Sequence, residues 1–113
     1  MRKSLSRTER LRSKADFARV FEEPDVKSAG RGAKLVAKRN GLEFNRFAVT
    51  FVRKFGKAVQ RNYARRVLKE IYRCRKQDFP IGYDIVVVLY AGDFSYQDRE
   101  HQFMKLIRRA NFG

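Results

Sequence analysis

The sequence predicts an α/β fold, in which helices pack on a small mixed sheet as a two-layer sandwich. Its 113 residues suffice for one hydrophobic core, so we expect a single domain over residues 1–113. Hydrophobic residues make up 43% of the chain and aromatic residues 13%, which is not the composition of a disordered basic tail. Helical and strand periodicities also alternate, in the order helix, three strands, helix, strand, helix.

The first helix follows a basic, polar stretch, residues 1–12, that we expect to be mobile. Ser13, with an aspartate three residues later, has the form of a capping box, so the helix begins there and runs to about Glu22. A proline two residues further on ends it. Phe17 and Phe21 lie four residues apart, so they share one face of this helix.

Strand patterns occur on both sides of the longest helix. Asp25–Arg39 holds two short strands around its glycines, and in the second, Lys34–Lys38, basic and apolar side chains alternate. Phe47–Val52 is a clear strand with small and large apolar residues in turn. Tyr83–Tyr90 contains five consecutive aliphatic residues, which indicates a strand that is central in the sheet or covered on both faces.

Two further helices complete the expected architecture. The longest covers Lys57–Lys76, a stretch without proline or glycine. The last begins at Ser95, where the capping-box pattern recurs, and runs to about Ala110. The apolar side chains of this last helix fall on one face, namely Tyr96, Phe103, Leu106, Ile107 and Ala110.

The formal net charge of +15 indicates a polyanionic partner, because self-repulsion of this size destabilises a compact monomer. Residues 57–76 alone hold 8 basic residues and 1 acidic residue. An anionic membrane would need a free apolar face, and that face of the long helix is the expected partner of the sheet. The longest apolar run, Ile85–Ala91, is too short to cross a bilayer. A single cysteine, Cys74, suits a cytoplasmic protein.

The basic side chains of the long helix gather on one half of a helical wheel, and its apolar side chains, Val59 and Tyr63 among them, gather on the other. Four of the basic residues form a row at intervals of four, spaced about 6 Å along the axis, close to the phosphate repeat of a nucleic-acid strand. A row of one sign costs stability, so we interpret it as a polyanion surface, with an ordinary solvated face as the alternative. The row consists of Arg61, Arg65, Lys69 and Arg73.

This helix also carries the most specific motif. Residues 56–70 read Gly-Lys-Ala-Val-Gln-Arg-Asn-Tyr-Ala-Arg-Arg-Val-Leu-Lys-Glu. They resemble the signature of the protein subunit of bacterial ribonuclease P: Gly-Asn-Ala-Val, any residue, Arg-Asn-Arg, any residue, Lys or Arg, then Arg. Leu11–Phe21, Phe47–Lys54 and Tyr83–Leu89 resemble its other elements in the same order. The chain departs from the signature at Lys57, where the family has Asn, and at Tyr63, where the family has its second Arg.

The resemblance implies a fold and a function. The strand–helix–strand crossover around the basic helix would be left-handed, against the general rule. The protein would join a catalytic RNA that removes the 5′ leader of precursor tRNA, with Mg²⁺ held mainly by that RNA. The protein would bind the RNA through the basic helix, at Lys57, Arg61, Asn62, Arg65, Arg66, Lys69 and Arg73.

The resemblance further implies a cleft for the single-stranded leader. Such a cleft needs aromatic rings for stacking and cations for phosphates. Core packing is the competing interpretation of the two phenylalanines, and a solvated strand end that of the basic pair. The candidate residues are Phe17, Phe21, Lys34, Lys38, Arg53 and Lys54.

We expect no catalytic or metal-binding residue in the protein itself. Its acidic residues are few and lie away from the basic surface, and the lone His101 has no evident partner for acid–base work. A metal-dependent nuclease is therefore disfavoured. A structural RNA-binding protein of the ribosomal or RNA-chaperone type is the alternative that composition alone leaves open.

Overall fold

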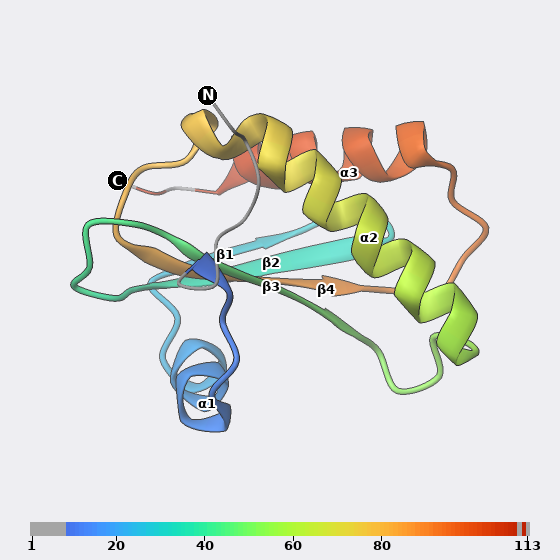
Figure 1. Ribbon diagram of the computed structural model, residues 1–113. Coiled ribbons are helices and arrows are strands. Elements are labelled where there is room, and N and C mark those ends of the chain that lie inside the picture. Colours follow the sequence, from blue (N-terminus) through green and yellow to red (C-terminus); the bar gives the residue numbers. More distant parts are fainter. Residues whose placement is uncertain (1–8, 111, 113) are drawn as a thin grey trace.

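The computed structural model describes residues 9–110 and 112, and its elements follow the predicted order (Figure 1). The sandwich is of the α/β class that the sequence predicts. Its helices and strands are α1 (Lys14–Glu22), β1 (Val26–Ala29), β2 (Ala33–Arg39), β3 (Arg46–Phe51), α2 (Ala58–Arg75), the short 3-10 helix η2 (Lys76–Asp78), β4 (Tyr83–Leu89) and α3 (Tyr96–Arg109).

The four strands form one mixed sheet in the order β1-β2-β4-β3. β1 and β2 are antiparallel, as are β2 and β4, whereas β3 and β4 are parallel. Parallel neighbours need a crossover connection, and α2 supplies it over one face of the sheet (Figure 1). The handedness of this crossover stays a prediction. All seven residues of β4 are buried, as its aliphatic run predicts for a central strand.

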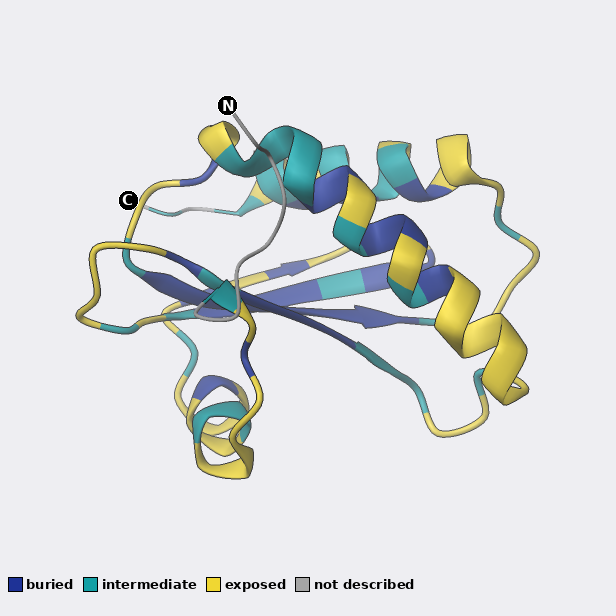
Figure 2. Ribbon diagram, viewed as in Figure 1, coloured by how far each residue is buried: buried dark blue, intermediate teal, exposed yellow. Residues whose placement is uncertain are grey.

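Helices cover the two faces of the sheet unequally (Figure 2). Alternate residues of a strand point to opposite faces. Leu35 and Val87, which pair across β2 and β4, belong to the larger core under α2 and α3. Val36 and Val86, the next pair, belong to a smaller core with Val20 of α1. Among the helices of the described residues, α1 is the one that packs on this second face, so the charged residues of that face lie beside a small core.

The segment before α1 differs in part from the mobile stretch predicted over residues 1–12. Residues 1–8 lie outside the described part of the chain. Arg10 forms a parallel bridge with Phe47, and the Leu11 N–H donates to the Phe47 carbonyl at 3.2 Å. The Leu11 side chain is only 5% exposed, within the smaller core. An edge strand offers unpaired backbone groups, and β3 is such a strand, so this segment has a partner there.

The first turns of α2 also differ from the prediction. The helical wheel puts Val59 and Tyr63 on the buried side, yet their exposed fractions are 79% and 57%. Figure 2 shows these turns as exposed, where α2 extends past the end of the sheet. Tyr96, expected on the apolar face of the last helix, is 37% exposed in the first turn of α3.

Candidate nucleic-acid interface

The start of α2 depends on Gly56, which matches the signature, and on Gln60, which occupies its variable position. The Lys57 N–H donates to Gln60 Oε1 at 2.8 Å, which satisfies one of the free amides of the first turn. A Cβ on Gly56 would lie 2.2 Å from that same oxygen, at a φ of +154°. The positive φ favours glycine here, and the exposed Lys57 follows it at the N-terminal end of the basic row.

The basic side chains lie on the outer face of α2, as predicted. Arg61, Asn62 and Arg66 are exposed, and Arg65 is half-buried. The Arg65 guanidinium donates to Asn62 Oδ1 at 3.1 Å and lies 5.1 Å from the centre of the Phe51 ring at the end of β3. Arg65 therefore reaches from the helix to the edge of the sheet.

Two arginines that the candidate set omits join this row. A hollow of about 410 Å³, here called the cationic hollow, is lined by Arg10 together with six residues of α2. Burial lowers the pKa of Lys69, and the charges of Arg10, Arg65 and Arg12 lower it further. Four like charges thus face one another, and a bound phosphate would relieve their repulsion. The α2 residues of the hollow are Asn62, Arg65, Arg66, Lys69, Glu70 and Arg73.

An acidic residue offsets the row at its C-terminal end. Arg73 Nε donates to Glu70 Oε2 at 3.0 Å, and Arg73 Nη2 donates to Glu70 Oε1. This hydrogen bonding lowers the pKa of the Glu70 carboxyl and raises that of Arg73. The positive charge available to an RNA is therefore greatest toward the N-terminal half of α2 and the Arg10 segment.

The predicted leader-binding residues are spread over the other face of the sheet. Phe17 is half-buried against the smaller core, whereas Phe21 is 41% exposed and stands outside it. Lys34 and Lys38 lie on either side of Val36 on this face. The Lys38 ammonium donates to the Glu23 carbonyl at 2.9 Å, so it holds the end of α1.

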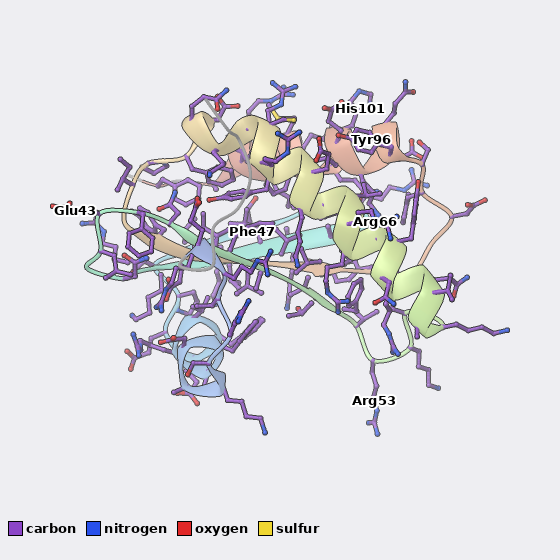
Figure 3. The ribbon with its side chains drawn as sticks, in the orientation of Figure 1. Glu43, Phe47, Arg53, Arg66, Tyr96 and His101 are labelled. Atoms are coloured by element: carbon purple, nitrogen blue, oxygen red, sulfur yellow. The ribbon has the colours of Figure 1, made fainter. Side chains whose placement is uncertain are left out.

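Arg53 and Lys54 are exposed in the turn after β3. Figure 3 shows Arg53 pointing away from α2, toward the side of the sheet where α1 lies, while Arg66 projects from α2. The structure thus separates this basic pair from the row on α2.

A small hollow at the edge of β3 brings one leader candidate next to the row. This edge hollow has a volume of about 210 Å³, and Phe17 and Arg65 both line it. Sequence patterns do not reveal that Phe17 and Arg65 lie close together, because their proximity depends on how residues 10–12 lie along β3. The remaining lining residues are Arg10, Leu11, Arg12, Phe47, Ala48, Val49 and Lys69.

Two of the acidic groups in the C-terminal part, Asp84 and Asp98, have structural partners. Asp84 is hydrogen-bonded to Arg46, and Asp98 caps α3. Within the described residues, no three His, Cys, Asp or Glu side chains are grouped as a metal ion would need, and His101 is exposed. No helix in that part of the chain is long and apolar enough to span a membrane.

Comparisons with known proteins agree on one family. The family model described as Ribonuclease P matches residues 5–111. The ribonuclease P protein component of Petrotoga mobilis is 35% identical, over 94% of this chain and 94% of the relative. That of Thermotoga maritima is 42% identical, over 78% of this chain and 74% of the relative. The solved RNase P protein from Thermotoga maritima has a TM-score of 0.79 at 30% identity, covering 89% of this chain and 96% of its own.

Proposed function

Because this chain belongs to the ribonuclease P protein family, we propose that it is the protein subunit of a ribonucleoprotein that removes the 5′ leader of precursor tRNA. In this proposal the partner RNA performs the hydrolysis, and the protein binds RNA. The observation that carries the proposal is the basic row of α2, which lies within the matched signature and is joined by Arg10 and Arg12.

The row suits the catalytic RNA in geometry and charge. Guanidinium groups bind phosphate oxygens through two parallel hydrogen bonds, and this row contains more Arg than Lys. Burial is the main cause of the lowered pKa of Lys69, and the charges of Arg10, Arg65 and Arg12 add to it, so the free protein holds several cations close to one another. RNA phosphates bound between these cations would remove their mutual repulsion, and this relief would add to the binding free energy.

The edge hollow supports a role in leader binding. Phe17 offers a half-buried ring, and Arg10, Arg12 and Lys69 supply charge around it. Rings and cations together bind a single strand without reading its sequence. The leader would then pass from this hollow along the face that carries Lys34, toward Arg53 (Figure 3).

Magnesium belongs to the RNA in this proposal. The residues that the structure describes provide no group of three metal-binding side chains, and the basic surface repels a divalent cation. The protein's contribution is electrostatic, since neutralising RNA phosphates lowers the Mg²⁺ concentration at which the RNA can fold and bind substrate.

Reconstitution tests the proposal. The full-length protein is added to a bacterial ribonuclease P RNA at low Mg²⁺, and cleavage of precursor tRNA is measured. We expect cleavage to rise with protein concentration and no cleavage from the protein alone. A variant with Arg61 and Arg66 both changed to Ala serves as the binding-deficient control, because both side chains are exposed and their loss leaves the core intact. Absence of stimulation by the unaltered protein would refute the proposal.

A further inference from the structure

A third hollow is lined by residues of the first turns of α2 and of the loop that leads into α3. Figure 1 shows these two segments at the same end of the molecule. Its volume is about 620 Å³, within the range of pockets that hold small ligands. It is separate from the surface of α2 that forms the cationic hollow. We call it the aromatic hollow, and its apolar side chains include Phe55, Val59, Tyr63, Phe94 and Tyr96.

Several of these apolar and aromatic side chains are exposed to solvent, although their burial would be favourable. Val59 and Tyr63 are mostly solvent-exposed, and Tyr96 is more than one-third exposed. Contiguous exposed apolar groups on a soluble protein mark a binding surface. Here they surround a concave site, so a flat apolar ligand would bury them together.

The buried residue of the aromatic hollow, Arg99, is held in place by several contacts. The guanidinium of Arg99, a residue only 4% exposed, lies 4.5 Å from the centre of the Phe94 ring and 5.9 Å from that of Phe55. Its two Nη groups donate to the carbonyls of Gly32 at 3.0 Å and Tyr90 at 3.2 Å. The rings of Phe55 and Phe94 are therefore held in place before any ligand binds, which reduces the ordering cost on that side of the hollow.

Asp93 gives the hollow a specific polar group. Asp93 lines the hollow, and its carboxylate has no hydrogen-bond or ion-pair partner among the described residues. A carboxylate accepts two parallel hydrogen bonds. Guanine presents two such donors side by side, N1–H and the exocyclic amine, next to a ring that stacks on aromatic side chains.

The aromatic hollow borders the basic row. Asn62 and Arg66 line the cationic hollow. Tyr63, which lines the aromatic hollow, directly follows Asn62 and lies one turn before Arg66. A strand whose phosphates contact Arg66 would therefore bring an unpaired base to Tyr63. Figure 3 shows Arg66 on α2 and Tyr96 on α3, at this side of the sheet.

We propose that the aromatic hollow holds one unpaired guanine of the RNA that binds α2, with its ring against Tyr63 and its Watson–Crick edge toward Asp93. The inference rests on the proposed function and adds a base-reading site to it. A peptide segment would be the other occupant of an apolar hollow. The flanking cations of α2 favour a polyanion over a peptide.

Fluorescence tests the inference in the full-length protein. The chain contains no tryptophan, so the Tyr63→Trp variant carries a single tryptophan, which lies in the hollow and is excited selectively over the remaining tyrosines. The probe is a short oligouridylate with one central guanine, and the matched probe has adenine there. We expect the guanine probe to quench the fluorescence, and to bind about tenfold more tightly than the adenine probe. An Ile81→Trp variant, with its fluorophore in the exposed loop before β4, should show no quenching.

The second variant separates base reading from general attraction. Asp93→Asn in the Tyr63→Trp background should keep binding both probes and lose the preference for guanine. Equal affinity for the two probes in the Tyr63→Trp protein would overturn the proposal. Quenching that depends on protein concentration without RNA would also overturn it, because the occupant would then be a second copy. Stimulated precursor cleavage without quenching would leave the proposed function standing and reject this site alone.

Discussion

Arg46 of β3 and Asp84 of β4 form a double hydrogen bond, from Nε to Oδ1 and from Nη2 to Oδ2, each at 2.7 Å. The third nitrogen of the same guanidinium, Nη1, donates to Asp16 Oδ2 of α1 at 3.2 Å. Asp84 is 2% exposed and also accepts from Asn40 at 3.0 Å. The hydrogen bond to Asp84 raises the pKa of Arg46. One arginine therefore ties α1, and with it Phe17, to the two parallel strands.

Loss of the Asp84 carboxylate should destabilise the whole domain. The Asp84→Ala variant leaves Arg46 partly buried without its main partner, which costs about 3 kcal/mol in the free energy of unfolding. Urea denaturation measures this cost. Asp78→Ala, at an exposed site in η2, is the control and should change the midpoint little. An Asp84→Ala midpoint equal to that of the control would show that the pair contributes nothing net.

Removal of Arg65 should weaken RNA binding in a salt-dependent way. Loss of one phosphate contact makes the slope of log K against log salt less steep by up to about one unit. The affinity of the Arg65→Ala protein for the ribonuclease P RNA is measured at several salt concentrations. Arg108→Ala, which removes an exposed arginine of α3, is the matched control. An unchanged slope would exclude Arg65 from the interface.

Truncation of Phe17 should affect the leader more than the body of the substrate. Because Phe17 lines the edge hollow and is half-buried, Phe17→Ala removes a stacking surface worth about 1–3 kcal/mol per base. Affinity is compared for precursor tRNA and mature tRNA in the reconstituted complex. Phe44→Ala, in the loop before β3, removes an exposed ring elsewhere and controls for lost apolar surface. Equal losses for the two substrates would favour a purely structural role.

Acid should weaken the start of α3 through Asp98. The Ser95 N–H donates to Asp98 Oδ2 at 2.9 Å and lowers the pKa of that carboxyl below its ordinary value of 3.8. A carboxyl with a lowered pKa stabilises the fold above its ordinary value, and this contribution is lost as the pH falls through the folded-state pKa. The melting temperature of Asp98→Ala should therefore lie below that of the unaltered protein near neutral pH, with a gap that closes in acid.

The control for this pH dependence is Ser95→Ala. It removes the hydroxyl that accepts from the Asp98 N–H at 3.1 Å, which is the second cause of the carboxyl's lowered pKa, and keeps the backbone N–H, which is the largest cause. Its own melting curve should thus retain most of the acid sensitivity. A gap between Asp98→Ala and the unaltered protein that stays constant with pH would contradict the assignment.

The helices and strands follow from local patterns, and so does the basic face of α2. Capping at Ser13 and Ser95 needs only neighbours three residues away. The Ser13 hydroxyl accepts from two amides of the first turn. Asp16 accepts instead from Arg19 and Arg46, so it does not complete the predicted capping box. Val59 and Tyr63 illustrate the limit of such patterns. A helical wheel gives the direction of each side chain, but it does not reveal where the sheet beneath the helix ends.

The site depends on contacts between distant segments, and these the sequence does not reveal. Arg10 joins the row of α2 only because it pairs with Phe47 at the edge of β3. Asp84 resembles a member of a loose acidic group until its partner, Arg46, is found on another strand. In the sequence, only the basic composition of the N-terminal segment suggests that Arg10 belongs to the RNA-binding surface.

The strand order has a consequence for the growing polypeptide on the ribosome. β4, Tyr83–Leu89, lies between β2 and β3 in the sheet but follows both of them in the chain. Synthesis proceeds from the N-terminus, so residues 1–76, which carry the entire surplus of positive charge, emerge before their central strand exists. The most cationic part of the nascent chain is thus exposed among cellular RNA while it is still unable to complete its sheet.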